Sequence, residues 1–196
     1  MSVRDSIRIH CASWLLKYIP GQAGSYLNKL AWGQKNGFSK KSITTSFIYE
    51  NVLMVMAGAI LSLPILTILA EQLDSQLTSF LPYLLMILVI IMLLPSVFRR
   101  MLNVVMRLAR RDQFVESDFL SGSSIFRFQL EYLLPRLLNG VGFVLLAISI
   151  LPVVEPNMYV GLAASYVFAG IVGMLAIFIP GGIGVRESVI VLLVSA

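Results

Sequence analysis

Residues 159–187 read YVGLAASYVFAGIVGMLAIFIPGGIGVRE, an apolar run that ends in a proline–glycine break and is followed by two charges. Residues 159–180 contain no Asp, Glu, Lys, Arg or His. A helix that crosses a hydrocarbon core of about 30 Å needs about 20 residues of this kind. The run therefore predicts a transmembrane helix.

Three further runs, residues 52–70, 80–98 and 137–154, are equally free of charged residues. Across the chain, 58% of residues are hydrophobic and only 13% are charged, whereas soluble domains carry about 25% charged residues. Membrane-spanning strands alternate apolar and polar positions, and these runs do not. The sequence predicts an all-α, polytopic transmembrane helix bundle in a single domain over residues 1–196, with at least four spans at these four runs.

The positive residues follow a topological pattern. Lys and Arg precede the first run, lie between the second and third, and appear once after the fourth, while residues 71–79 and 155–158 contain none. The positive-inside rule then places the positively charged segments of this multi-pass membrane protein in the cytoplasm. This distribution accounts for the net charge of +5 and argues against a nucleic-acid partner.

Residues suited to catalysis or metal binding are scarce. The chain has one cysteine, Cys11, beside its one histidine, His10, which excludes an internal disulfide and a multi-cysteine metal site. The acidic residues are scattered along the sequence. We therefore expect no metal, no cofactor and no enzymatic activity.

Shorter segments flank the runs. Residues 3–18 have amphipathic helical spacing, which fits either an interfacial helix or the end of a longer span. A second short helix is expected near residues 25–32, and Ser39 is expected to cap the helix that leads into the first run. Residues 185–196 form a partial helix that is too short to span. The chain is then either a fragment of a longer protein, which we favour, or this segment is a re-entrant half-helix.

The pattern I-P-G-x-x-G occurs twice, at residues 19–24 (IPGQAG) and 179–184 (IPGGIG). Each copy follows an apolar helical segment and precedes another helix, so the two are either equivalent points of an internal repeat or a chance recurrence. The pattern predicts glycine-rich helix breaks. The candidate substrate-binding residues are Pro20, Gly21 and Gly24 in the first copy and Pro180, Gly181, Gly182 and Gly184 in the second.

The second copy continues into Arg186 and Glu187, next to apolar sequence on both sides. A break of this kind leaves backbone N–H groups unpaired at the start of the next helix, where the helix dipole favours an anion such as a lipid phosphate. Arg186 would strengthen that site. Glu187 is either a first-turn acid that the dipole satisfies or a carboxylate that binds a cationic head group or a proton. Glu50, at the entry to the first run, is a further binding candidate or an interfacial residue left in water.

Taken together, residues 18–24 (YIPGQAG), residues 46–50 and residues 180–187 (PGGIGVRE) resemble the lysylphosphatidylglycerol synthase transmembrane-region family. The resemblance implies an inner-membrane protein of a bacterium that handles a lipid or lipid-linked substrate near the two glycine motifs, with envelope-glycan biosynthesis proteins as partners. Asn51 stands where the family pattern has a basic residue, which makes a role for Glu50 less secure. The soluble aminoacyl-transfer domain of some members is not present in this sequence, so lipid aminoacylation is not assigned to the chain.

These observations favour a flippase or transporter of an anionic lipid or lipid-linked substrate. Two alternatives stay open: a membrane-embedded transferase, which would need a carboxylate or metal-binding cluster, and a scaffold of an envelope-polysaccharide system.

Overall fold

The computed structural model describes residues 3–16, 23–72, 80–108, 114, 119–151, 153–176 and 178–195. Within these ranges the chain forms helices and no strand, which confirms the all-α membrane-type bundle. The helices are α1 (Val3–Leu15), α2 (Ala23–Lys35), α3 (Lys40–Leu61), α4 (Leu63–Gln72), α6 (Leu81–Leu93), α7 (Pro95–Leu108), α8 (Gly122–Ile150), α9 (Tyr159–Leu175) and α10 (Val185–Val194), with short 3₁₀ turns η4 (Pro156–Met158) and η5 (Pro180–Gly182).

Local sequence signals set where the long helices begin. Ser39 caps α3, because its side-chain oxygen accepts a hydrogen bond from the Ser42 backbone N–H at 3.1 Å, as the sequence predicts. Ser121 caps α8 in the same way through the Ser124 N–H at 3.3 Å. Each serine satisfies a donor that the first helical turn would otherwise leave unpaired.

Three helices in the described ranges are long and apolar enough to cross a membrane: Lys40–Leu61, Gly122–Ile150 and Pro156–Leu175. Two of the expected runs are interrupted. Residues 52–70 divide between α3 and α4 at Ser62, whose hydroxyl donates to the Gly58 carbonyl at 2.7 Å just before Pro64. Residues 80–98 divide between α6 and α7 at Leu94, because Pro95 cannot donate a helical hydrogen bond.

Helix α8 differs most from the expected arrangement. It begins at Gly122 rather than near residue 137 and continues through Pro135. Arg136, which the charge pattern assigned to a cytoplasmic connection, therefore lies near the middle of a helix. The predicted span at residues 137–154 thus overlaps the second half of a longer helix, because the absence of charged residues marks an apolar run but does not mark where a helix starts.

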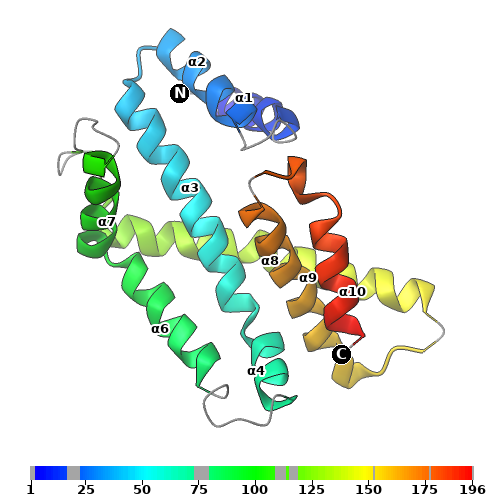
Figure 1. Ribbon diagram of the computed structural model, residues 1–196. Coiled ribbons are helices and arrows are strands. Elements are labelled where there is room, and N and C mark those ends of the chain that lie inside the picture. The colour runs from blue at the N-terminus through cyan, green and yellow to red at the C-terminus, as the bar shows by residue number, and fades with distance from the viewer. Residues whose placement is uncertain are drawn as a thin grey trace.

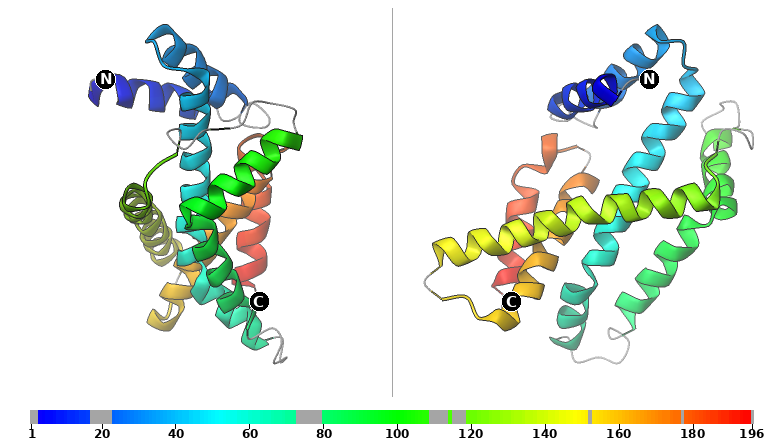
Figure 2. Two further views of the ribbon diagram at one scale, coloured as in Figure 1. Left: turned by 90° about the vertical axis from the view of Figure 1, so that its left-hand side faces the viewer. Right: turned by 180° about the vertical axis from the view of Figure 1, so that it is seen from behind.

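Helix α9 occupies the centre of the bundle and packs against α3, α8 and α10. Helix α8 crosses obliquely over one side of α3 and α9, while α10 runs back along α9 (Figures 1 and 2). Close approach is possible where residues are small: a Cβ built on Gly140 of α8 would lie 3.2 Å from the Ala163 Cβ of α9. Helices α1 and α2 lie across the end of α3, near η5 (Figure 1).

Large apolar side chains cover the outside of the bundle. Along α8 the exposed set includes Leu134, Leu137, Leu138, Val141, Leu145, Leu146 and Ile150. Helix α6 is apolar almost throughout and exposes Tyr83, Leu84, Ile87, Leu88, Ile90 and Ile91. Patches of this extent are not tolerated in water. The chain is an integral membrane protein whose outer surface suits lipid.

Candidate functional site

One cavity of about 470 Å³ lies between the helices. Helices α1, α2, α3, α8 and α9 and the segment around η5 all contribute to its wall. Its lining carries many polar side chains for a membrane protein, namely His10, Ser13, Ser25, Lys29, Glu50, Asn51, Tyr132, Arg136, Asn139, Tyr166 and Arg186. Polar and charged side chains that gather in a cavity of a membrane protein are candidates for substrate binding, so this cavity is the candidate site.

The second glycine motif places Arg186 in the cavity. Gly181, Gly182 and Gly184 have φ angles of 63°, 68° and 87°, a region that residues with a Cβ rarely adopt. Gly182 also lies against the α9 backbone, since a Cβ built on it would be 2.5 Å from the Gly173 carbonyl oxygen. The glycines therefore let the chain reverse tightly against α9, and α10 then starts with Arg186 in its first turn.

Two aromatic rings support Arg186. One of its terminal guanidinium nitrogens donates to the Tyr166 hydroxyl at 3.2 Å, and the guanidinium carbon lies 5.6 Å from the centre of the Tyr166 ring. Tyr166 itself stacks on Phe143 of α8 at 4.8 Å between ring centres. The Arg186 Nε is buried without a hydrogen-bond partner among the described residues.

Arg136 reaches the same cavity from α8. Its guanidinium passes Gly170 of α9, where a built Cβ would lie 3.4 Å from an Arg136 nitrogen. In the part of the chain that the structure describes, Arg136 has no hydrogen bond and no ion pair. Gly170 and Gly173 lie about one helical turn apart. Because neither residue has a side chain, this face of α9 leaves room for both arginine side chains.

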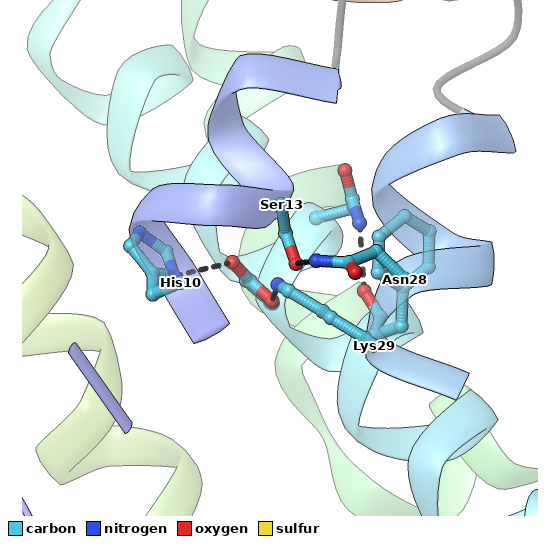
Figure 3. A network of polar contacts seen from close by, with 7 residues as sticks. His10, Ser13, Asn28 and Lys29 are labelled. Atoms are coloured by element: carbon cyan, nitrogen blue, oxygen red, sulfur yellow. Dashed lines mark hydrogen bonds and ion pairs between the residues drawn. The ribbon is translucent and has the colours of Figure 1, made fainter. Parts of the chain in front are cut away.

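Glu50 forms the acidic part of the site. Its carboxylate is ion-paired with Lys29 of α2, and its second oxygen lies 3.6 Å from Nδ1 of His10 in α1. The Asn28 side chain donates to the Ser13 hydroxyl at 3.0 Å, which ties α1 to α2 beside this pair. Figure 3 shows His10 and Lys29 approaching the same carboxylate from two helices. Glu50 is therefore not an interfacial residue left in water, because only 20% of its side chain is exposed.

The predicted site residues divide into three groups. Glu50, Gly181, Gly182 and Arg186 line the cavity together. Pro180, Gly184 and Glu187 belong to the same break but do not line it, and Gly24 is buried in α2 outside the lining. Pro20 and Gly21 lie outside the described residues, as does most of the first I-P-G-x-x-G copy.

Glu187 acts on its own helix. Its carboxylate accepts a hydrogen bond from the Gly184 backbone N–H at 2.7 Å at the start of α10. The backbone N–H of Glu187 itself and, next, this contact with Gly184 lower the pKa of the exposed carboxyl. Of the two interpretations of Glu187, a first-turn acid or a carboxylate that binds a cationic head group or a proton, this contact fits the first-turn acid. Glu187 therefore occupies part of the N-terminus of α10, and Arg186 is the positive side chain at this break.

Sequence reasoning missed Arg136, Lys29 and Tyr166. Arg136 and Lys29 were grouped with the topological charges, and Tyr166 was counted within an apolar run. One local signal was available for Arg136, which stands directly after Pro135 and beside the apolar run that begins at residue 137. Lys29 and Tyr166 acquire their roles only through contacts with residues that are distant in the sequence.

No group of three or more His, Cys, Asp or Glu side chains among the described residues is placed to hold a metal ion. The cavity lining offers two guanidinium groups, one ammonium–carboxylate pair and several neutral hydrogen-bonding side chains.

The comparison with known proteins agrees with this membrane architecture. No curated protein and no solved structure matches the chain. The family model described as the lysylphosphatidylglycerol synthase TM region matches residues 1–196, the whole chain. The protein therefore belongs to the lysylphosphatidylglycerol synthase TM region family.

Proposed function

We propose that this protein is a multi-pass translocator of the bacterial inner membrane that moves an anionic lipid or lipid-linked substrate. The observation that carries the proposal is that Arg136 and Arg186 line one cavity between the helices without a carboxylate partner among the described residues. Unpaired positive charge is costly in a low-dielectric setting. A bound phosphate would compensate that cost.

The surroundings of the arginines also suit a lipid. Neutral side chains such as Asn51, Tyr132 and Asn139 lie in the same lining and provide hydrogen bonds for the remainder of a head group. Asn139 is exposed on α8 next to a surface of leucines, so the cavity wall adjoins the lipid-facing exterior. An acyl chain can then remain in the bilayer while the head group occupies the cavity.

The distribution of the positive residues supports an orientation of the protein in the membrane. Helix α3 begins with Lys40 and Lys41, and the described part of the chain places α2 with Lys35 at the same end as η5 (Figure 1). The positive-inside rule assigns this end to the cytoplasm. Access from the opposite side then requires movement of helices around the cavity, for which the proline inside α8, Pro135, and the break at η5 are suitable hinges.

The test is lipid scrambling in liposomes that contain the purified full chain. Wild type is compared with Arg136→Gln and Arg186→Gln, and with Arg127→Gln as the matched control. Arg127 lies on the same helix as Arg136 but is 79% exposed and paired with Glu131. The proposal expects both cavity variants to lose at least about tenfold in rate for an anionic lipid, as removal of a charge-assisted hydrogen bond predicts, and the control to match wild type. Wild-type liposomes that scramble no anionic lipid would contradict it and favour a transferase or scaffold.

A further inference from the structure

The described lining of the cavity carries more positive than negative side chains. Lys29 and Glu50 are ion-paired, so together they add no net charge. The second oxygen of Glu50 faces His10 rather than an arginine. Among the described lining residues Glu50 is the only carboxylate. Glu187 neighbours Arg186 in the sequence, but it accepts a hydrogen bond from Gly184 and does not line the cavity. Arg136 and Arg186 therefore bring two positive charges to the cavity, and no ion pair among the described residues involves either of them.

The two arginine side chains lie along the same stretch of α9. A guanidinium nitrogen of Arg136 lies at Gly170 and the aliphatic stem of Arg186 lies at Gly173, about one helical turn away. Arg136 and Arg186 also line the same cavity. The described partner of Arg186 is the neutral Tyr166 hydroxyl, and its Nε is buried without a partner. The cavity therefore holds two positive side chains, and at least one buried donor, the Arg186 Nε, has no partner among the described residues.

We propose, on the basis of the translocator function above, that the cavity selects a lipid head group with two negative charges, a phosphomonoester or a diphosphate, over a phosphodiester with one. A dianion neutralises both guanidinium groups, whereas a phosphodiester leaves one of them uncompensated in a low-dielectric site. The forked donors of arginine also match the additional terminal oxygens of a phosphomonoester or diphosphate. A phosphomonoester carries a charge of about −1.5 to −2 at pH 7.

The experiment measures the affinity of the full chain, in nanodiscs of a zwitterionic lipid, for two lipids with identical acyl chains. Phosphatidic acid supplies the phosphomonoester and phosphatidylglycerol supplies the phosphodiester. Wild type is expected to bind phosphatidic acid about tenfold more tightly, the effect of one additional charge-assisted contact. Arg136→Gln and Arg186→Gln should each reduce the preference to within about twofold, and Arg127→Gln should preserve it.

The outcomes separate this inference from the proposed function. Equal affinity of wild type for the two lipids, with scrambling intact, overturns the selection of a dianion and leaves the translocator standing. Binding of neither lipid contradicts both. A third arm adds inorganic pyrophosphate as a competitor. If the soluble anion displaces phosphatidic acid as effectively as unlabelled phosphatidic acid does, the occupant is a free anion and the lipid form of the inference is overturned.

Discussion

Tyr166 illustrates how one residue can determine the geometry of the site. Its hydroxyl accepts a hydrogen bond from Arg186 while its ring stacks on Phe143, so a side chain from α9 connects α8 with α10. The apolar run around it gives no sign of this role in the sequence. We regard Tyr166 as a positioning residue for Arg186.

Replacing Tyr166 with Phe removes the hydroxyl and keeps the ring. We expect the scrambling rate to fall by about three- to tenfold, because Arg186 loses a fixed partner, while the free energy of unfolding changes by no more than about 1 kcal/mol. Scrambling and thermal unfolding of the same preparation give both quantities. An unchanged rate would show that the aromatic ring alone positions the guanidinium.

Glu187 provides a pH-dependent prediction at the same scale. The carboxyl has a lowered pKa in the folded protein because backbone N–H groups stabilise its charged form. A group of this kind stabilises the fold above its ordinary pKa, and the contribution is lost as the pH falls through the lowered value. Hydrogen exchange at the Gly184 amide should therefore speed up on acidification beyond the intrinsic pH effect. Glu187→Gln should abolish that dependence, and retention of it in this variant would assign the effect to another group.

At the scale of elements, the junction between α9 and α10 depends on its glycines. Gly182 combines a positive φ with contact against the Gly173 backbone, so two independent constraints exclude a side chain. The sequence pattern predicted a helix break here. It did not show that the break folds back onto α9, because that contact involves residues from both sides of the turn.

Gly182→Ala should destabilise the protein by at least about 1–2 kcal/mol from the left-handed backbone alone, with steric overlap adding to this. It should also displace Arg186 and lower anionic lipid binding. Gly142→Ala in α8 is the matched control, because a Cβ built there meets no atom within 4 Å. Thermal unfolding and lipid binding measure the two effects, and equal behaviour of the two variants would contradict this account of the junction.

The ion pair between Lys29 and Glu50 joins α2 to α3. Both side chains are mostly buried, with 17% and 20% exposure, so removal of one partner leaves a charge with little access to water. Glu50→Gln should cost about 1–3 kcal/mol. The exchanged pair, Lys29→Glu with Glu50→Lys, should recover much of that loss because the attraction is restored. Chemical denaturation of the three proteins tests this, and an exchanged pair no more stable than the single variant would show that the carboxylate has a role beyond pairing.

For the molecule as a whole, sequence reasoning gave the fold class and the family reliably, because apolar runs and the glycine motif are local properties. Ser39 as a cap was predictable for the same reason. The extent of α8 was not, since Arg136 marks the start of the apolar run but not the start of the helix, which begins at Gly122. The site was predictable only in part. Arg186 and Glu50 stood out because they are charged residues beside apolar sequence. Their partners, Tyr166 for Arg186 and Lys29 for Glu50, are brought to them only by packing between helices.

The cavity itself is a property of the whole bundle. Arg136 comes from α8, Arg186 follows α9, and Glu50 and Lys29 close another part of the wall from α3 and α2. No single helix contains a binding site. The central claim is that this assembly brings Arg136 and Arg186 to bear on one anionic head group.

A double-mutant cycle on Arg136 and Arg186 tests that claim most directly, with binding of an anionic lipid to the full chain as the measured quantity. If both arginines hold one head group, Arg136→Gln and Arg186→Gln each weaken binding by about tenfold or more, and the double variant loses clearly less than the product of the two effects, with a coupling of at least about 0.5 kcal/mol. Losses that multiply independently, or no loss in either single variant, would contradict the account.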